Sequence, residues 1–371
     1  MDVKDIDTPA LVVDLDAMER NLAGMARFAR ERGLRLRPHA KMHKSAEIAR
    51  LQIAAGAVGV CVQKTAEAET LAAGGVDDIL VTNEVVAPHK LARLATLAQQ
   101  LAGRGGRLGV AVDSAHGVAA LAAAMAGVAA SIDVYVEIDV GHGRCGVAPG
   151  EAALALARQV GAHAPLRLAG LQAYHGRAQH QRTPAERAAS IAAGARAAAH
   201  TRDLIEAAGF GPLCITGAGS GTFTLEAASG VWHELQAGSY LFMDADYAAN
   251  EADPQAPVFE HALFVKAQVI SRQADRAICD AGHKSHAIDT GLPRVAWPEG
   301  LAFANGGDEH GVLHAAQPGV RLPAIGDTVW LIPGHCDPTV NLHDELLGVR
   351  GGLHAGRVER RIRVDARGAL T

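Results

Sequence analysis

A lysine set among histidines is the first group along the chain that could do covalent chemistry. The segment RPHAKMHKS places His39, Lys41 and His43 at alternate positions, so in an extended chain their side chains share one face. A lysine at the end of a buried strand is partly desolvated, which lowers the pKa of its amine and frees it for imine formation. Most lysines are solvated instead, and we expect that state for Lys44, at the start of the next helix.

A histidine and an aspartate near the C-terminus form a candidate metal pair. In His335-Cys336-Asp337 the first and third side chains would point together in an extended chain, while Cys336 would point away. One imidazole and one carboxylate suit Mn²⁺, Mg²⁺ or Zn²⁺, with waters completing the coordination shell. An isolated pair of this kind before Pro338 is otherwise typical of a polar turn.

A glycine-rich run at 217–222 (GAGSGT) is a candidate phosphate site. Glycines allow close backbone approach, and the N-terminus of a following helix offers free N–H groups and a favourable dipole. Ser220 and Thr222 add hydroxyl donors. Alone, such a run is more often a turn, and no Gly-Lys-Ser/Thr follows it as in a P-loop.

Eight short runs of strand-forming residues alternate with Ala-rich helical stretches, and they indicate what must position these groups. The runs lie near 34–38, 58–62, 78–82, 107–112, 132–138, 166–173, 212–216 and 233–237, and the first helices are expected over 15–32, 44–55, 64–74 and 87–103. Strands alternating with helices imply parallel βαβ units, and eight units imply a closed (β/α)₈ barrel. After about residue 250, β-rich runs such as HALFVKAQVIS and TVWLIPG predict a second, mostly antiparallel domain.

The polar residues gather at one end of the predicted barrel. Barrel enzymes carry their chemistry at the C-terminal ends of the strands, and phosphate sites commonly follow strands seven and eight. The groups that follow strand ends here are Lys41 after the first strand, Glu137, Asp139 and Arg144 after the fifth, Tyr174, His175 and His180 after the sixth, the glycine run after the seventh, and Ser239 and Tyr240 after the eighth. The sequence therefore predicts an active site at this end.

Composition excludes several other classes of function. The net charge is −5 and no Lys/Arg block occurs, which argues against nucleic-acid binding. Apolar stretches are short and interrupted, so no membrane span is expected, and the acidic N-terminus lacks the apolar region of a signal peptide. Five dispersed cysteines without a C-x-x-C pair indicate a reducing, cytoplasmic setting. Aromatic residues make up only 4%, so the core must consist mostly of Ala, Leu, Val and Ile.

Several motifs together resemble a known family. RPHAKMHKS, EIDVGHGRCGV, LQAYHGRAQH, TGAGSGTF, AGSYLFMD and PGHCDPTVNLHD resemble the D-threonine aldolases, which belong with the D-serine dehydratase-like enzymes in the alanine-racemase fold group of pyridoxal-phosphate enzymes. The resemblance runs from about Thr8 to about Asp344. It implies the following roles: Lys41 as the Schiff-base lysine, His180 as the catalytic base, Arg144 facing the cofactor's phenolic oxygen, Tyr174 near its pyridine ring, Gly219, Ser220, Gly221, Thr222 and Tyr240 on the phosphate side, and His335 and Asp337 as metal ligands.

The resemblance also implies the reaction and the assembly. We expect retro-aldol cleavage of D-threonine, or another D-3-hydroxy-amino acid, to glycine and an aldehyde, with pyridoxal 5'-phosphate and a divalent metal, Mn²⁺ or Mg²⁺. An imidazole, with an ordinary pKa of about 6.5, suits the removal of the 3-hydroxyl proton. We expect a barrel over 15–248, a β-domain over 249–371 joined by a first strand within about 1–14, and a homodimer in which each mouth is covered by the partner's β-domain.

Other functions on related scaffolds remain open. A dehydratase would remove the α-proton and expel the β-hydroxyl of D-serine or 3-hydroxyaspartate; the H-x-D metal motif, in place of H-x-C, favours the aldolase. A racemase has no need for the metal pair. A non-catalytic pyridoxal-phosphate-binding barrel would lack the second domain.

Overall fold

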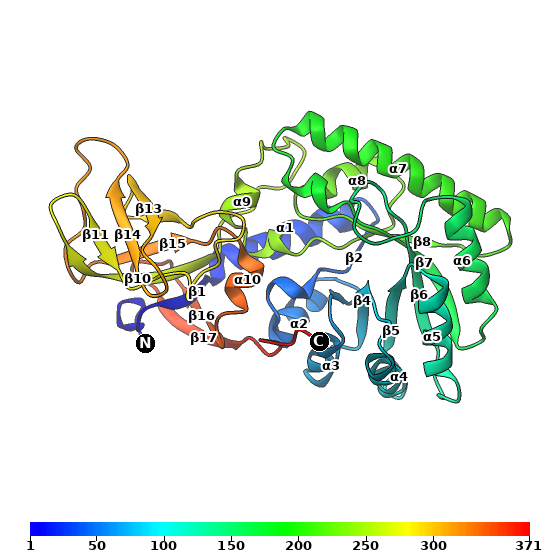
Figure 1. Cartoon of the computed structure of the whole chain (residues 1–371). Helices are drawn as coiled ribbons and strands as arrows, with labels where there is room; N and C mark the ends of the chain where they lie inside the picture. Colours follow the sequence, from blue (N-terminus) through cyan, green and yellow to red (C-terminus); the bar gives the residue numbers. More distant parts are fainter.

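The computed structural model describes all 371 residues, which form a barrel and a β-domain lying end to end (Figure 1). The barrel has eight strands in the order β2-β9-β8-β7-β6-β5-β4-β3, and every pairing is parallel. A parallel bridge between His39 and Cys61 joins the two ends of this row. The strands are β2 (Arg35–Leu36), β3 (Val60–Val62), β4 (Asp78–Glu84), β5 (Arg107–Val112), β6 (Ile132–Glu137), β7 (Leu166–Ala173), β8 (Cys214–Gly217) and β9 (Glu234–Leu235). The predicted eight-stranded α/β barrel is confirmed.

Helices surround the barrel strands. They are α1 (Leu15–Glu31), α2 (Ala46–Ala54), α3 (Thr65–Ala73), α4 (Pro88–Ala102), α5 (Ala115–Met125), α6 (Glu151–Gly161), α7 (Pro184–Ala207) and α8 (Phe223–Ser229). α1 begins where the Asp14 carboxylate accepts a hydrogen bond from the amide of Ala17, and it buries an apolar face that includes Met18 and Met25. The largest buried cluster of the barrel consists mostly of aliphatic side chains, with Trp232 its only buried aromatic residue, as the composition predicts.

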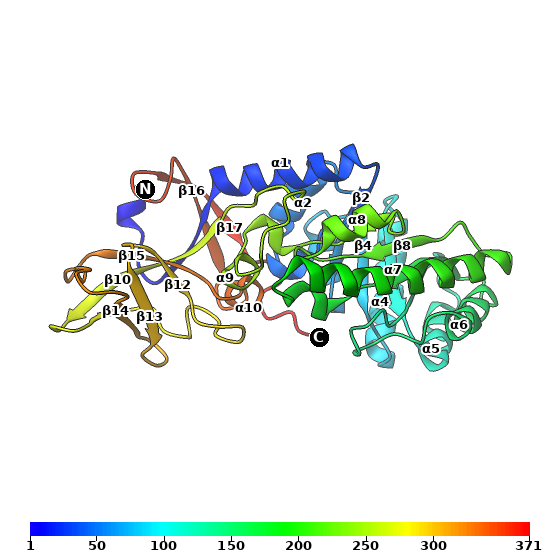
Figure 2. The same cartoon turned by 90° about the horizontal axis from the view of Figure 1, so that it is seen from above.

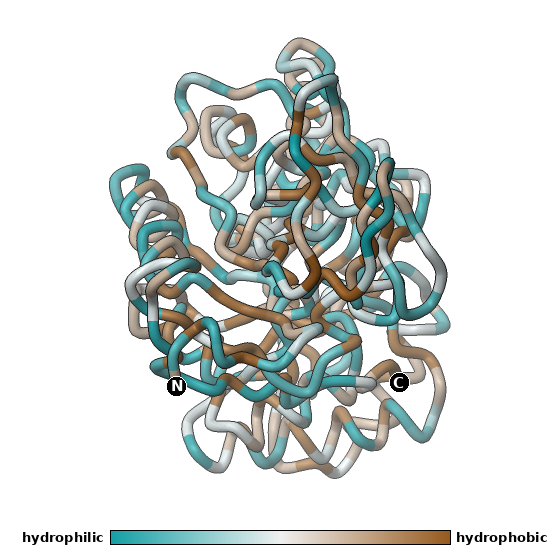
Figure 3. Tube along the Cα trace, turned by 90° about the vertical axis from the view of Figure 1, so that its left-hand side faces the viewer, coloured by the Kyte–Doolittle hydropathy of each residue, from teal (hydrophilic) through white to brown (hydrophobic).

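The β-domain is a mixed, mostly antiparallel sheet built from both ends of the chain. β1 (Ala10–Asp14) lies between β10 (Leu263–Arg272), to which it is antiparallel, and β16 (Glu345–Arg350), to which it is parallel. The remaining strands pair antiparallel: β11 (Ala277–Cys279), β12 (Arg294–Trp297), β13 (Leu301–Asn305), β14 (Gly311–Ala315), β15 (Thr328–Ile332) and β17 (Arg357–Arg363). Figure 3 faces this domain and shows hydrophobic and hydrophilic segments alternating along the trace.

The two parts share a hydrophobic core. One buried cluster contains Leu36 and Ala237 of the barrel together with Val265 and Leu331 of the β-domain. α1 runs from β1 toward the barrel (Figure 2), and two one-turn helices, α9 (Ala245–Ala248) and α10 (Cys336–Val340), lie near the junction. No helix has the length and apolar character that crossing a bilayer requires.

Candidate active site

One cavity at the C-terminal ends of the barrel strands collects most of the predicted site residues. Those that line it are Lys41, Arg144, Tyr174, His180, Gly219, Ser220, His335 and Asp337, joined by His39, Met42, Gln63, Thr82, Gln172, Ala218, Gln236, Gly238, Ser239 and Tyr247. The lining therefore comes from the barrel, from α9 and from the segment around α10. Gly221, Thr222 and Tyr240 lie behind the cavity wall.

Lys41 reaches into this cavity from a 3₁₀ turn over Ala40–Met42. Its Nζ lies 3.3 Å from Oδ2 of Asp337, so the amine of the barrel meets the carboxylate of α10. The negative charge of Asp337 raises the pKa of Lys41 and outweighs burial, which would lower it. The predicted lowering of the Lys41 pKa is therefore wrong, because the prediction considered burial alone and not the carboxylate of Asp337 beside the amine.

The residues around Lys41 do not share one face as an extended chain would. His39 lines the cavity, whereas His43 is completely buried, with its Nε2 3.2 Å from Oε1 of Gln52. Lys44 is buried too, and its Nζ lies 2.6 Å from Oε1 of Glu67. The predictions of a shared face and of a solvated Lys44 are both wrong, because the chain turns tightly after His39 and directs these side chains into the core.

His39 is a neutral part of the cavity wall. Its Nε2 lies 3.1 Å from Oε1 of Gln63 and 3.0 Å from Oγ1 of Thr82. Burial, followed by the charge of Lys41, lowers the pKa of His39 to about 3, so the ring carries no charge at neutral pH. Gln63 and Thr82 were not predicted as site residues, although Thr82 lies within a predicted strand.

The candidate metal pair converges through a helical turn and not through a strand. α10 begins at Cys336, and the Thr339 hydroxyl donates to the carbonyl of His335 at 2.7 Å, so the expected extended conformation is wrong. Nevertheless Nε2 of His335 lies 3.9 Å from Oδ1 of Asp337. Cys336 is buried with its Sγ 3.5 Å from the carbonyl of Met243, away from the cavity as predicted.

The donors of this pair are suited to a divalent cation. Oδ1 of Asp337 is buried and has no hydrogen-bond partner, which is costly for a carboxylate oxygen unless a cation satisfies it. Nδ1 of His335 lies 2.7 Å from Oδ2 of Asp289, so the carboxylate holds the proton on Nδ1 and leaves the Nε2 lone pair toward Asp337. Asp289 lies in a loop without a motif and was not predicted as a site residue.

The glycine-rich run forms an anion cradle with the turn after β9. The amides of Gly219, Ser220, Gly238 and Ser239 donate to no acceptor within the chain, and these four residues line the cavity. A Cβ atom on Gly219 would collide with the Gln179 side chain, so the close approach requires glycine there. Free amides at a concave surface fit a phosphate group.

The other predicted phosphate-side residues support this cradle from behind. The amide of Gly221 donates to Oε1 of Gln179 at 3.0 Å, and Nε2 of Gln179 donates to the buried Thr222 hydroxyl at 2.7 Å. The Tyr240 ring is completely buried, and Nε2 of Gln52 lies 3.4 Å from its hydroxyl. Only the Tyr240 amide faces the run, donating to Oγ of Ser220 at 2.8 Å.

His180 approaches the cavity from a 3₁₀ turn after β7. Its Nδ1 lies 2.5 Å from Oδ2 of Asp246, and its ring centroid is 5.6 Å from that of Tyr247. Burial would raise the pKa of Asp246, but the hydrogen bond from Arg182 and the neighbouring His180 hold it below its ordinary value, so the carboxylate stays charged. Asp246 was not predicted as a site residue, although it closely follows the AGSYLFMD segment after the eighth strand.

Arg144 and Tyr174 lie together at a further side of the cavity. The guanidinium carbon of Arg144 is 5.9 Å from the centroid of the Tyr174 ring, and His142 meets this ring edge-on at 6.1 Å. Arg144 has no ion-pair partner within the chain, so its charge is available to a ligand.

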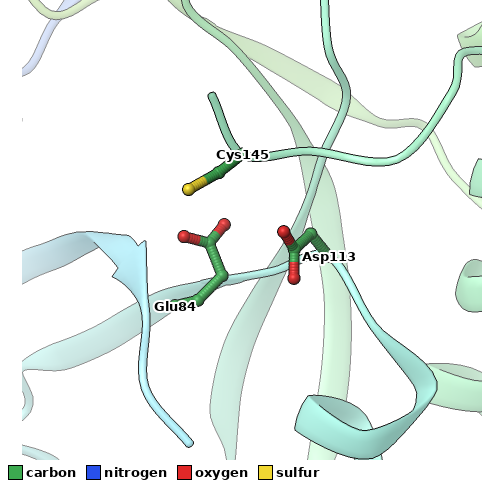
Figure 4. A group of neighbouring side chains, drawn as sticks. All are labelled: Glu84, Asp113 and Cys145. Atoms are coloured by element: carbon green, nitrogen blue, oxygen red, sulfur yellow. The ribbon is translucent and has the colours of Figure 1, made fainter. Parts of the chain in front are cut away.

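An acidic cluster lies at the ends of β4 and β5. Glu84, Asp113 and Cys145 point toward one another (Figure 4), with one donor atom of each within 4.8 Å of the others. The amide of Gly146 donates to Asp113 at 3.2 Å. Burial, followed by the charge of Glu84, raises the pKa of Cys145 to about 11, so its thiol keeps its proton beside these carboxyl groups.

Comparison with known proteins places this cavity in a family. Residues 13–246 match the family described as alanine racemase, N-terminal domain, and residues 262–349 match the putative serine dehydratase domain. A D-threonine aldolase of an Arthrobacter species is 47% identical over 98% of this chain and 93% of its own length. A 3-hydroxy-D-aspartate aldolase of Paracoccus denitrificans is 41% identical over 99% of this chain and 94% of its own length.

The fold agrees with the same relationship. The crystal structure of D-threonine aldolase from Filomicrobium marinum superposes with a TM-score of 0.95 and 46% identity, covering 100% of this chain and 98% of the other. The similarity therefore includes both the barrel and the β-domain.

Proposed function

The chain belongs to the D-threonine aldolases of the alanine-racemase fold group, and we propose that it cleaves D-threonine and other D-3-hydroxy-amino acids to glycine and an aldehyde, with pyridoxal 5'-phosphate and a divalent metal. One observation carries this proposal: an amine, an imidazole and a histidine–aspartate pair from three distant parts of the chain line a single cavity. The amine is that of Lys41, the imidazole is that of His180, and the pair is His335 and Asp337.

Pyridoxal phosphate, when bound, supplies an electron sink for the pair released as the Cα–Cβ bond breaks. Lys41 would carry it covalently, the free amides of Gly219 and Ser220 would receive its phosphate, and Arg144 and Tyr174 would contact its ring side. The cradle would be held in shape by the backbone and packing of Gly221, Thr222 and Tyr240, which would affect the phosphate indirectly. The unpaired amides and the unpaired guanidinium of Arg144 support this assignment.

The chain's own task is to bind the substrate and remove the proton of its 3-hydroxyl group. We assign this proton to Nε2 of His180, because Nδ1 is engaged by Asp246 and a neutral imidazole has one basic nitrogen. His335 and Asp337 would hold Mn²⁺ or Mg²⁺, which supplies a Lewis acid for the hydroxyl oxygen. The unpartnered Oδ1 of Asp337 supports a cation at this position.

A dehydratase is the second candidate, favoured by the match of 262–349 to a putative serine dehydratase domain. Incubation of the protein, loaded with cofactor and metal, with D-threonine separates the two. Aldol cleavage yields glycine and acetaldehyde, whereas dehydration yields 2-oxobutanoate and ammonia. Accumulation of 2-oxobutanoate without glycine would reject the aldolase assignment.

We further propose a cytoplasmic homodimer in which each partner's β-domain covers the other's barrel mouth. Five cysteines without a disulfide support the reducing compartment. Sedimentation equilibrium at several protein concentrations measures the assembly, and a monomer at all of them would contradict the dimer.

A further inference from the structure

His180 has one side-chain hydrogen-bond partner, and that partner lies outside the cavity lining. Oδ2 of Asp246 is 2.5 Å from Nδ1 of His180. The Asp246 side chain is 7% exposed, whereas that of His180 is 46% exposed. The carboxylate is thus enclosed by protein while the imidazole opens to the cavity.

Asp246 is itself held in place from two sides. Nη2 of Arg182 donates to its Oδ1 at 2.5 Å, and Nη1 of Arg182 donates to its backbone carbonyl at 2.7 Å and to Oδ1 of Asn250 at 2.8 Å. Both carboxylate oxygens therefore have a partner, which fixes the plane of the group. A fixed acceptor dictates the position of the donor that it binds.

The short helix α9 (Ala245–Ala248), which contains Asp246, is hydrogen-bonded to the segment of the candidate metal pair. The amides of Ala245 and Asp246 donate to the carbonyls of Pro333 and Gly334, at 3.0 and 3.2 Å. In the other direction, the amide of Cys336 donates to Oδ2 of Asp244 at 3.0 Å. α9 is therefore hydrogen-bonded to the segment that carries His335 and Asp337. Through Asp246, the position of His180 is tied to the position of that pair.

We propose that Asp246, clamped by Arg182, is a positioning residue that fixes the tautomer and the ring direction of His180. A carboxylate only accepts hydrogen bonds, so Nδ1 of His180 carries the proton and the Nε2 lone pair faces the cavity. The charge of Asp246 also stabilises the imidazolium that forms when Nε2 accepts a proton from the substrate hydroxyl. This inference rests on the proposed role of His180 as the base.

Asp246→Asn tests the inference because it keeps the size of the group and removes its charge. An asparagine amide can donate to Nδ1 and so place the proton on Nε2, the wrong nitrogen. We expect kcat for D-threonine cleavage to fall by about 10²–10⁴-fold, with little change in KM. Exchange of the Cα proton of glycine, which requires no hydroxyl deprotonation, should change by less than about threefold in the same preparation. Asp203→Asn, which removes an exposed carboxylate on α7, is the matched control and should match the wild type in both reactions.

A double mutant separates positioning from a structural role. If Asp246 acts only through His180, then Asp246→Asn should cost nothing further in a His180→Ala background. Additive losses in kcat, or an equal loss in glycine exchange, would overturn the inference. Should Asp246→Asn not fold, Arg182→Lys loosens the same clamp and should give a smaller but equally selective loss; equal losses in the two reactions would again overturn the inference. Absence of any D-threonine cleavage by the wild type would instead overturn the proposed function.

Discussion

Asp289→Ala should weaken metal binding without touching the metal ligands. Oδ2 of Asp289 lies 2.7 Å from Nδ1 of His335 and holds the proton on that nitrogen. Without the carboxylate, the ring of His335 can rotate and can place its proton on Nε2, the nitrogen that faces Asp337. Partners of this kind typically contribute 10- to 100-fold, roughly, to metal affinity.

The exposure of the pair sets the expected size of the effect. The Asp289 side chain is 50% exposed and that of His335 is 24% exposed, so water can replace the lost acceptor in part. We therefore expect the lower end of the range, about a tenfold rise in the Kd for Mn²⁺, or about 1.4 kcal/mol. Metal-free protein titrated with Mn²⁺, followed by electron paramagnetic resonance of the free ion and by D-threonine cleavage, measures this Kd.

The chain contains a matched control for this experiment. His283 and Asp308 form a similar pair in the β-domain, with 3.0 Å between Nε2 and Oδ1, and neither lines the cavity. Asp308→Ala should leave the Kd for Mn²⁺ unchanged. An unchanged Kd in Asp289→Ala, in a protein whose unfolding temperature matches the wild type, would refute the role of Asp289.

Three further changes test separate parts of the structure. Lys41→Ala should abolish the visible absorption of the loaded protein and its quenching by borohydride; retention of both with full turnover would contradict the cofactor assignment. A chelator should abolish cleavage but leave that absorption; full activity in metal-free protein would exclude the metal site. In Asp337→Cys, the metal that restores activity best should shift from Mn²⁺ toward Zn²⁺, because a thiolate is the softer ligand. Lys44→Met should lower the free energy of unfolding by about 3–5 kcal/mol in urea titrations, because it leaves the Glu67 carboxylate buried without its cationic partner. The double mutant Lys44→Met/Glu67→Gln should recover part of this loss. A loss below about 1 kcal/mol would show that the pair is dispensable for stability.

The barrel could be predicted from the sequence because each unit repeats a local signal. Strand-forming runs and Ala-rich helices alternate at regular intervals, and the first four helices end within two residues of their expected bounds. The closing bridge between His39 and Cys61 needs no further signal, since eight parallel units leave no other partner for the end strands.

The errors lie where a single turn replaces an extended segment. At 39–44 and at 335–337 the alternation of a strand was assumed, but local hydrogen bonds form a turn at each place. The Thr339 hydroxyl bonds to the carbonyl of His335, and the His39 ring accepts from the amide of Lys41 at 3.4 Å. Such bonds depend on single side chains and leave no periodic pattern.

The orienting carboxylates could not be found for another reason. Asp246 lies 66 positions from His180, and Asp289 lies 46 positions before His335. Contacts at these separations are created by the tertiary folding of the chain, and no spacing rule links the partners. Resemblance to a family finds the groups that do the chemistry, while the groups that hold them become visible in the folded chain.

Two of the three imidazoles that line the cavity use the same device with different strength. His180 and His335 each direct Nδ1 to an aspartate, at 2.5 and 2.7 Å, and so present Nε2 to the cavity. Asp246 is enclosed and clamped by Arg182, whereas Asp289 is half exposed and has no such clamp. A charge-assisted hydrogen bond is stronger where water is excluded. Asp246 should therefore contribute more free energy to the orientation of His180 than Asp289 contributes to that of His335. The difference suits the two tasks: a metal ion can itself hold His335 in place, whereas His180 has only Asp246 to keep its basic nitrogen directed at the substrate.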